Sequence, residues 1–280
     1  MDHPVDILEK GPFHCVINKP PGQLVVQARG ETNLTALEQI RLALGKNLCA
    51  VHRLDRVTSG CLVFARGQFA QQALGNAFKR HLIDKRYLAF VEGPVGFQKH
   101  DLSAPLKRID GTSKKGPAAW QTVDPDGQKA RTRFRTLLST PEFSVVEAFP
   151  HTGRMHQIRI HLAHLGHPIV GDELYGAQSP FAPNQIGLHA HGISIPLPKG
   201  GRTFVHAPPP DNWFAFAKQH NINLPELIQD CVQRFKAKPK PSVQKPRVSK
   251  TANQKKGALK SSSPRRKAKK ANRNHRQKRS

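Results

Sequence analysis

The C-terminal segment separates sequence that can fold from sequence that cannot. Residues 236–280 contain 18 Lys and Arg, no Asp or Glu and no aromatic residue. A segment of this composition has too little apolar surface to offset the entropy that is lost on ordering. We therefore expect a disordered basic tail over residues 236–280 and one compact domain over residues 1–235.

The tail also carries most of the charge of the protein. It supplies +18 of the net charge of +26, which leaves +8 on residues 1–235. A flexible polycation can bind nucleic acid, an anionic membrane surface or an acidic protein, or it can simply keep the chain soluble. Because the tail has neither an amphipathic aromatic pattern nor a lipidation motif, we expect nucleic acid as its partner and no membrane.

Cysteine usage and the N-terminus indicate the compartment. Cys15, Cys49, Cys61 and Cys231 form no Cys-x-x-Cys pair, which predicts reduced thiols rather than a zinc ribbon or a disulfide framework. The sequence has no secretory signal pattern and no run of 18 apolar residues. We expect a cytoplasmic protein, and we expect a monomer.

The spacing of apolar residues predicts more strands than helices. Residues 94–128 are rich in Gly, Pro and polar residues, so we expect loops there, with at most short hairpin strands. Because strands and helices do not alternate regularly, we expect an α+β fold with a mixed, largely antiparallel sheet flanked by helices. The predicted strands are 13–17, 61–65, 86–91, 131–138, 143–149, 188–195 and 203–206, and the predicted helices are 35–44, 69–81, 152–165 and 224–235.

One carboxylate is a candidate catalytic group. Asp55 lies just before the apolar strand 61–65, and it is flanked by Arg53 and Arg56. Nearby cations favour an ionised carboxylate, which is the form needed in a nucleophile or a base. Most loop aspartates are structural, however, and from this segment alone a turn-capping role for Asp55 is favoured.

The segment 149–168 contains the predicted helix 152–165, with Thr152 as its cap. In helical register His156 and Arg159 project together from one side, and an arginine there can pair with a buried carboxylate. Five histidines suggest metal binding, and the pair His161 and His164 has suitable spacing. Because no cysteine lies nearby and no HExxH pattern occurs, we expect phosphate contacts or packing for these histidines, and no metal.

A third segment, residues 85–93, is predicted to be a strand. Its period of two places Tyr87, Ala89 and Val91 on one face. Packing alone accounts for a tyrosine at such a position.

Taken together, these segments resemble the RluA family of pseudouridine synthases. The matching stretches occur in the order found in that family and span roughly residues 13–210. They are INKPPG at 17–22, HRLDRVTSGCLVFA at 52–65, KRYLAFVEG at 85–93, HTGRMHQIRIHLAHLGHPIVGDELYG at 151–176 and LHAHGISIP at 188–196.

The resemblance implies the pseudouridine synthase catalytic core and an isomerase that needs no metal and no nucleotide cofactor. Uracil is cut from ribose at nitrogen 1, rotated and rejoined through carbon 5. By resemblance, Asp55 is the catalytic carboxylate, Tyr87 lines the uracil pocket and could act as a base, and Arg159 pairs with Asp55. Arg53 would fill the space left by the flipped nucleotide. The further expected substrate or RNA contacts are His52, Lys19, Arg154 and His156.

The RNA target is open at this stage. Ribosomal RNA is favoured over transfer RNA, because a cationic tail suits a large and densely charged target. The short stretch before Phe13 leads us to expect no N-terminal RNA-binding module of the kind that many larger members carry. Two rival hypotheses are a non-catalytic RNA-binding or ribosome-assembly factor that retains the fold, and a metal-dependent nuclease.

Overall fold

Strand β4 (Ser59–Arg66) is buried between two helices that cover opposite faces of one sheet. Successive residues of a strand point to opposite faces, so its apolar run supplies two packing surfaces. On one face Cys61, Val63 and Ala65 pack in a cluster with Ala70, Leu74 and Ala77 of helix α2 (Gly67–Lys79). On the other face Leu62 and Phe64 pack with Ala36 and Ile40 of helix α1 (Ala36–Leu44).

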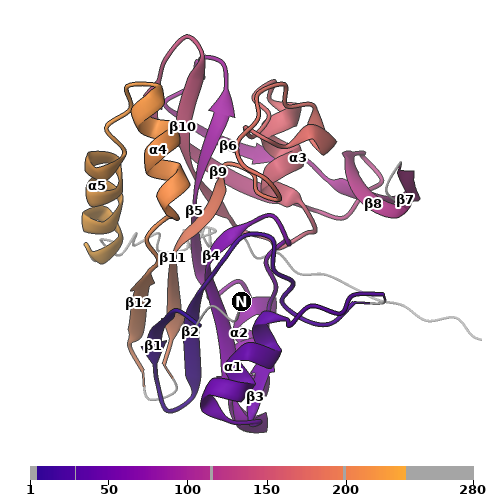
Figure 1. Ribbon diagram of the computed structural model, residues 1–280, viewed down its shortest axis with the longest axis vertical. Coiled ribbons are helices and arrows are strands. Elements are labelled where there is room, and N and C mark those ends of the chain that lie inside the picture. The colour runs from indigo at the N-terminus through magenta and orange to yellow at the C-terminus, as the bar shows by residue number, and fades with distance from the viewer. Residues whose placement is uncertain (1–4, 29, 114–115, 198–199, 238–280) are drawn as a thin grey trace, which may run out of the picture. The chain divides into compact units, whose positions relative to one another are not determined.

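Strand β5 (Asp84–Glu92) repeats this arrangement in the other half of the fold. Ala89 and Val91 pack toward helix α3 (Gln157–His164), whereas Leu88 and Phe90 pack toward the two C-terminal helices. Figure 1 shows α3 on one side of this half and α4 (Asp211–Gln219) and α5 (Leu224–Lys236) on the other. Because both faces of these central strands are covered, residues 61–65 of β4 and 88–91 of β5 are apolar without a break.

The computed structural model describes residues 5–28, 30–113, 116–197 and 200–237, without the side chains of residues 112–118. These residues belong to a unit that spans Met1–Lys238. The sequence predicts a disordered tail over residues 236–280. From residue 238 on, this tail lies outside the described residues.

Within the described residues, ten strands form one mixed sheet, in which β4 and β11 are parallel and every other pair is antiparallel. This confirms the predicted fold class. The order is β1-β2-β4-β11-β5-β10-β9-β6, with β12 on β11 and β3 on β4. The bounds not yet given are β1 Ile7–Lys10, β2 His14–Lys19, β3 Leu48–Ala50, β6 Lys99–Ser103, β9 Arg131–Ser139, β10 Phe143–Pro150, β11 Leu188–Pro196 and β12 Arg202–His206.

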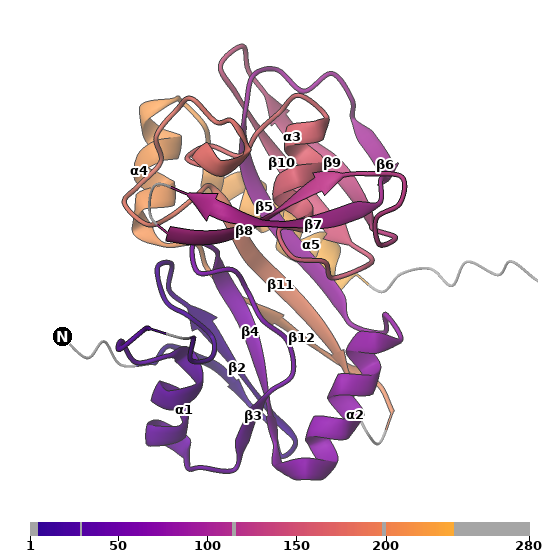
Figure 2. The same cartoon turned by 90° about the vertical axis from the view of Figure 1, so that its right-hand side faces the viewer.

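Two segments differ from the prediction. Residues 94–128 form β6 and a hairpin of two eight-residue strands, β7 (Leu106–Ser113) and β8 (Gly116–Val123), rather than loops; Figure 2 shows the hairpin beside α3. The predicted helix 152–165 begins only at Gln157, because His156 has a left-handed backbone, φ 53°, that interrupts the helical path. Thr152 does not cap α3 through the backbone; its hydroxyl donates to the side chain of Gln157 instead.

Three elements were not predicted, namely β1, β3 and α4. Strands β1 and β3 are short and pair with longer neighbours, β2 and β4. Helix α4 owes its position to Trp213, which is fully buried against Phe90 of β5. Tertiary contacts therefore define these elements more than local pattern does.

Candidate active site

Asp55 lies in the loop between β3 and β4, at the point where β4 comes very close to β11. The N–H of Thr58 donates to the carbonyl of Asp55 at 3.1 Å and closes a turn. Gly60, φ +109°, follows, and a Cβ there would lie 2.4 Å from the carbonyl oxygen of Ala190. Only glycine permits this approach. The turn leaves the Asp55 carboxylate 23 % exposed, close to the point where two halves of the sheet meet.

The loop is anchored by Arg56, which does not contact the Asp55 carboxylate. Arg56 makes a two-bond ion pair with Glu31, both bonds at 2.8 Å, and donates to the carbonyl of Gly22 at 3.1 Å. Its own carbonyl accepts from the N–H of Gly22 at 2.8 Å. The loop that carries Asp55 is therefore tied to the turn that follows β2.

Lys19 belongs to this anchor, and the prediction that it contacts RNA is corrected here. Its side chain is fully buried, and its ammonium donates to the carbonyls of Pro20, Gln23 and Arg56 at 2.7, 3.0 and 3.3 Å. All three of its donors are used within the protein. Burial lowers the pKa of Lys19 to about 7, although the charge of Asp55 opposes this shift.

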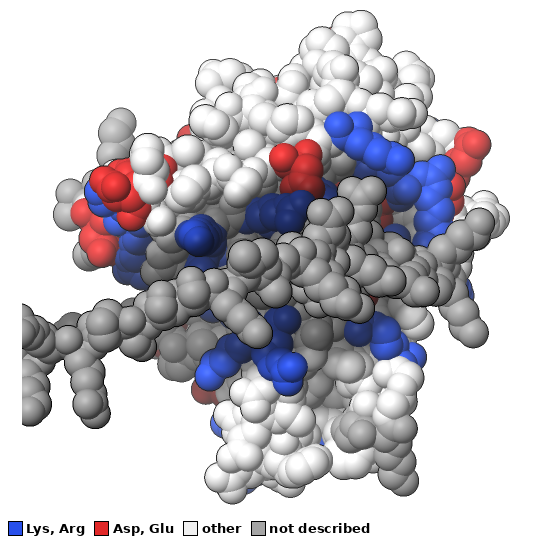
Figure 3. Space-filling model, turned by 180° about the vertical axis from the view of Figure 1, so that it is seen from behind, with Lys and Arg blue, Asp and Glu red and all other residues white. Residues whose placement is uncertain are grey.

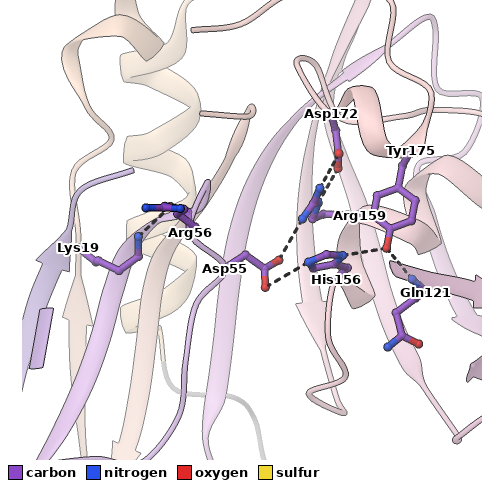
Figure 4. A network of polar contacts seen from close by, with 8 residues as sticks. All are labelled: Lys19, Asp55, Arg56, Gln121, His156, Arg159, Asp172 and Tyr175. Atoms are coloured by element: carbon purple, nitrogen blue, oxygen red, sulfur yellow. Dashed lines mark hydrogen bonds and ion pairs between the residues drawn. The ribbon is translucent and has the colours of Figure 1, made fainter. Parts of the chain in front are cut away.

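Arg159 stands between two carboxylates. Its Nη1 is 3.6 Å from Oδ2 of Asp55, while its Nε and Nη2 donate to the two oxygens of Asp172, each at 2.7 Å (Figure 4). Burial alone would lower the pKa of Arg159, but the hydrogen bonds to Asp172 and the charges of Asp172 and Asp55 raise it overall. The guanidinium therefore stays charged, and Asp172 rather than Asp55 holds it in place.

His156 is the second group that faces Asp55, because its Nε2 lies 4.0 Å from Oδ1 of that carboxylate. Its Nδ1 is 2.9 Å from the hydroxyl of Tyr175, whose oxygen accepts from the N–H of Gln121 at 3.0 Å. Every donor in this series of hydrogen bonds has an acceptor when the Tyr175 hydroxyl donates to Nδ1. The proton of the neutral ring then sits on Nε2, toward Asp55. Burial lowers the pKa of His156, partly opposed by the charge of Asp55, which is consistent with a neutral ring.

Tyr175 links this network to the β7–β8 hairpin. It lies in a short 3-10 helix, Glu173–Tyr175, and the guanidinium of Arg159 sits over its ring, 5.1 Å from the centroid. The Tyr175 hydroxyl accepts from the N–H of Gln121, which is a residue of β8. One tyrosine therefore contacts Arg159 and His156, the two groups that face Asp55, and an element that is distant in the sequence.

Tyr87, on β5, lines the same pocket as Asp55. Burial raises the pKa of its phenol, and the nearby charge of Asp55 raises it further. The phenol therefore stays protonated near neutral pH. A protonated hydroxyl can donate a hydrogen bond, but it is a weak base.

A pocket of about 560 Å³ contains these groups. It lies where loop 51–58, β5 and the segment before α3 meet. Seven of the eight predicted site residues line it, and Lys19 does not. These seven are His52, Arg53, Asp55, Tyr87, Arg154, His156 and Arg159.

Three of the lining residues differ in how far their side chains are engaged in contacts within the protein. His52 accepts from the N–H of Val63 at 2.9 Å and stacks on Phe78, and burial lowers its pKa to about 3, so it supports the wall as a neutral ring. Arg53 and Arg154 are exposed. Arg154 donates to the carbonyl of Lys129 at 3.2 Å, which leaves part of its guanidinium available at the rim.

Of the histidine pair that suggested a metal, His161 is used for packing and His164 is exposed. His161 is fully buried, with one ring nitrogen 2.8 Å from the hydroxyl of Thr132 and the other 3.0 Å from the carbonyl of Ala104. Both ring nitrogens are thus engaged, which leaves none for a metal.

A different cluster, Glu147, His191 and Cys231, has metal-ligand chemistry within the described residues. The carboxylate of Glu147 already pairs with Arg135 and lies 3.6 Å from Arg86. Two guanidinium groups therefore compensate its charge where a cation would have to sit.

The surface view shows Lys and Arg side chains gathered across the middle of one face (Figure 3). A concentration of positive charge attracts polyanions such as nucleic acid. Among the described residues, no helix has the length and apolar character needed to cross a membrane.

Comparison with known proteins assigns the chain. The sequence model of the RNA pseudouridylate synthase family matches residues 14–164, more than half of the 280 residues. The chain belongs to this family. As a member of the RNA pseudouridylate synthases it is an RNA-modifying isomerase of the RluA type, which confirms the resemblance seen in the motifs.

Individual family members cover most of the chain. It is 34 % identical over 212 residues to tRNA pseudouridine synthase C of Haemophilus ducreyi, covering 70 % of this chain and 86 % of that protein. It is also 34 % identical over 202 residues to ribosomal large subunit pseudouridine synthase C of Vibrio cholerae, covering 69 % and 62 %. The solved structure of Human RNA Pseudouridylate Synthase Domain Containing 1 superposes with a TM-score of 0.64 at 26 % identity, covering 85 % of this chain and 96 % of that one.

Two residues of the site were not predicted from this synthase sequence. These are Asp172, which holds Arg159, and Tyr175, which contacts His156. Both occur in the stretch GDELYG at 171–176, which matched the family motif. The motif indicated that this stretch mattered, but only the fold brings it against α3.

Proposed function

We propose that this synthase converts specific uridines of a structured RNA into pseudouridine, with Asp55 as its catalytic carboxylate. The observation that supports this most directly is the position of the Asp55 carboxylate, 3.6 Å from Arg159 in a pocket that Tyr87 also lines. A partly desolvated carboxylate held beside a fixed guanidinium is suited to stabilise charge that develops on a bound substrate.

The isomerisation breaks one bond and forms one bond. The bond between N1 of uracil and C1′ of ribose is cleaved, and C5 then bonds to C1′, while C5 loses a proton and N1 gains one. Cleavage builds positive character on the sugar, and the negative charge of Asp55 stabilises it. Arg159, held by Asp172, keeps that carboxylate in position.

The remaining pocket residues bind and orient the target in this proposal. A base in a structured RNA must leave its stack, at a cost of a few kcal/mol, and stacking and cationic contacts in the pocket recover that cost. Tyr87 presents a ring and a protonated hydroxyl to the uracil, because the pKa of its phenol is raised by burial. Arg53 and Arg154, both exposed, contact the surrounding RNA.

Ribosomal RNA is the target that we propose over transfer RNA. One matched relative is named as a tRNA enzyme and another as a ribosomal large subunit enzyme, so the names do not distinguish between the two targets. The preference rests on the 18 Lys and Arg of residues 236–280. A segment with this charge gains most from a large RNA that presents many phosphates at once.

The test is transcriptome-wide pseudouridine mapping in cells that have or lack the protein, complemented with the wild type or with Asp55→Asn. We expect sites in ribosomal RNA to disappear without the protein and to return only with the wild type. Asp126→Asn, an exposed aspartate in the turn after β8, is the matched control and should restore the sites.

Other outcomes would favour the alternatives. Lost sites that lie only in transfer RNA would overturn the choice of ribosomal RNA. Full restoration by Asp55→Asn would remove Asp55 from the chemistry. A growth defect that Asp55→Asn repairs, with no change in any pseudouridine, would favour the non-catalytic RNA-binding or assembly factor.

A further inference from the structure

A second pocket, of about 400 Å³, adjoins the active-site pocket. We call it the lateral pocket. The two pockets share His81, Lys85 and Pro150 as lining residues, so one leads into the other. The lateral pocket is built from the ends of α2, β5, β9 and β10, and its charged and ring-bearing lining includes Arg86, Arg131, Arg133 and His151.

Most acidic groups near the lateral pocket already have partners. Asp84 lines it but pairs with Arg202 at 2.9 Å, and Asp101 forms a two-bond pair with Arg131. Arg133 is exposed and has no ion pair or side-chain hydrogen bond with any other described residue. The lateral pocket therefore presents a guanidinium that makes no ion pair with the described residues, although Asp101 is its cross-strand neighbour.

His81 and His151 lie within this positive environment. Their rings stack at a centroid distance of 4.8 Å, and both residues are exposed at the pocket. The pKa of His151 is lowered first by burial and then by cationic neighbours alone, which are His81, Arg131, Arg133 and Lys85. No carboxylate is among the groups that shift this pKa, so an anion placed here would relieve repulsion between like charges.

We propose that the lateral pocket binds a phosphodiester group of the RNA strand that flanks the target uridine. The inference rests on the proposed function, because the strand must enter the adjoining pocket. An RNA strand, rather than a small phosphate ester, fits the exposed lining and the direct connection through His81 and Lys85. Arg133 is the main contact, since a guanidinium with free N–H groups binds phosphate oxygens in pairs.

The proposal can be tested with binding alone. The probes are a fluorescent RNA of ten uridines and, as its competitor, the nucleoside uridine, which has no phosphate. The full-length protein is titrated as the wild type, as Arg133→Gln, as Arg133→Lys and as Lys46→Gln. Lys46 is exposed in the turn between α1 and β3 and lines neither pocket, so its variant removes one positive charge elsewhere.

We expect Arg133→Gln to weaken binding of the ten-uridine RNA on the order of tenfold while leaving uridine binding unchanged. The slope of log affinity against log salt should become shallower by about 0.7, the value for one phosphate contact on a single strand. Arg133→Lys should keep the slope and recover part of the affinity, because it keeps the charge but loses the planar fork. Lys46→Gln should change affinity for the RNA less than Arg133→Gln does.

Three results would overturn the proposal. One is equal weakening by Arg133→Gln and Lys46→Gln, which indicates a general charge effect. Another is equal loss of uridine and RNA binding, which indicates damage to the active-site pocket. The third is that the wild type binds inorganic phosphate but the phosphate does not displace the ten-uridine RNA, which indicates a separate small-anion site. None of these measurements requires catalysis, so failure of the proposed function would appear separately, as a lack of pseudouridine formation by the wild type.

Discussion

Asp172 holds the guanidinium of Arg159 through two hydrogen bonds of 2.7 Å, and both side chains are buried. The same guanidinium is 3.6 Å from Asp55. The geometry of the site thus depends on a carboxylate that faces away from the pocket.

Asp172→Asn removes the charge that fixes Arg159 but keeps an acceptor of similar shape. We expect turnover of RNA to fall on the order of 100-fold, because a small displacement of a positioned group has an effect of that size. Single-turnover rates and RNA binding are measured together, with Asp110→Asn of the exposed Arg108–Asp110 pair as control. Unchanged turnover in a folded Asp172→Asn protein would contradict the positioning role.

Tyr175→Phe removes the hydroxyl between Gln121 and His156 but keeps the ring under Arg159. We expect kcat to fall about tenfold with little change in KM, since the loss corresponds to one hydrogen bond that orients the His156 ring. Thr122→Val, the neighbouring residue of β8, is the control and should retain full activity. A rise in KM at constant kcat would indicate that Tyr175 contacts RNA instead.

His189→Gln should change how stability depends on pH. His189 is fully buried, with its ring between the hydroxyl of Ser59 and the carbonyl of Ala207, and burial lowers its pKa from 6.5 to about 3. Between these two values the unfolded chain binds a proton that the folded chain excludes. The free energy of unfolding therefore decreases as pH falls from 6.5 toward 3.

The contribution of His189 to this decrease reaches at most about 1.4 kcal/mol per pH unit. Urea unfolding at several pH values should show a shallower acid decline for His189→Gln than for the wild type. The variant should also be less stable at neutral pH, where the two hydrogen bonds of the wild-type ring are present. His164→Gln, at an exposed position, should keep the wild-type pH slope.

Local pattern was sufficient for the elements whose apolar spacing is long and regular. The predicted helix 35–44 matches α1, and in the structure the side chains of Thr35 and Glu38 make reciprocal hydrogen bonds at its start. The apolar run at 61–65 predicted β4, which is buried over almost its whole length. In such segments one residue period describes both the local conformation and the packing.

Local pattern failed where distant contacts define the backbone. Thr152 and the apolar spacing beyond it favoured a helix from residue 152, but His156 adopts a left-handed conformation while its ring reaches both Tyr175 and Asp55. The polar stretch 94–128 forms a hairpin whose Gln121 N–H is bound by Tyr175. Neither partner is near in the sequence, so no window of local residues contains the signal.

The printed sequence alone was enough to identify the family, the mixed sheet and the pocket residues Asp55, Tyr87 and Arg159, because motif residues and strand periodicity are local properties of the chain. It was not enough to show that Asp172 holds Arg159, that Lys19 is buried among carbonyls, or that Arg133 and His151 meet beside the active site. These relationships join residues from different strands and loops. They arise only when the sheet brings those strands together and burial removes water from between their charged groups.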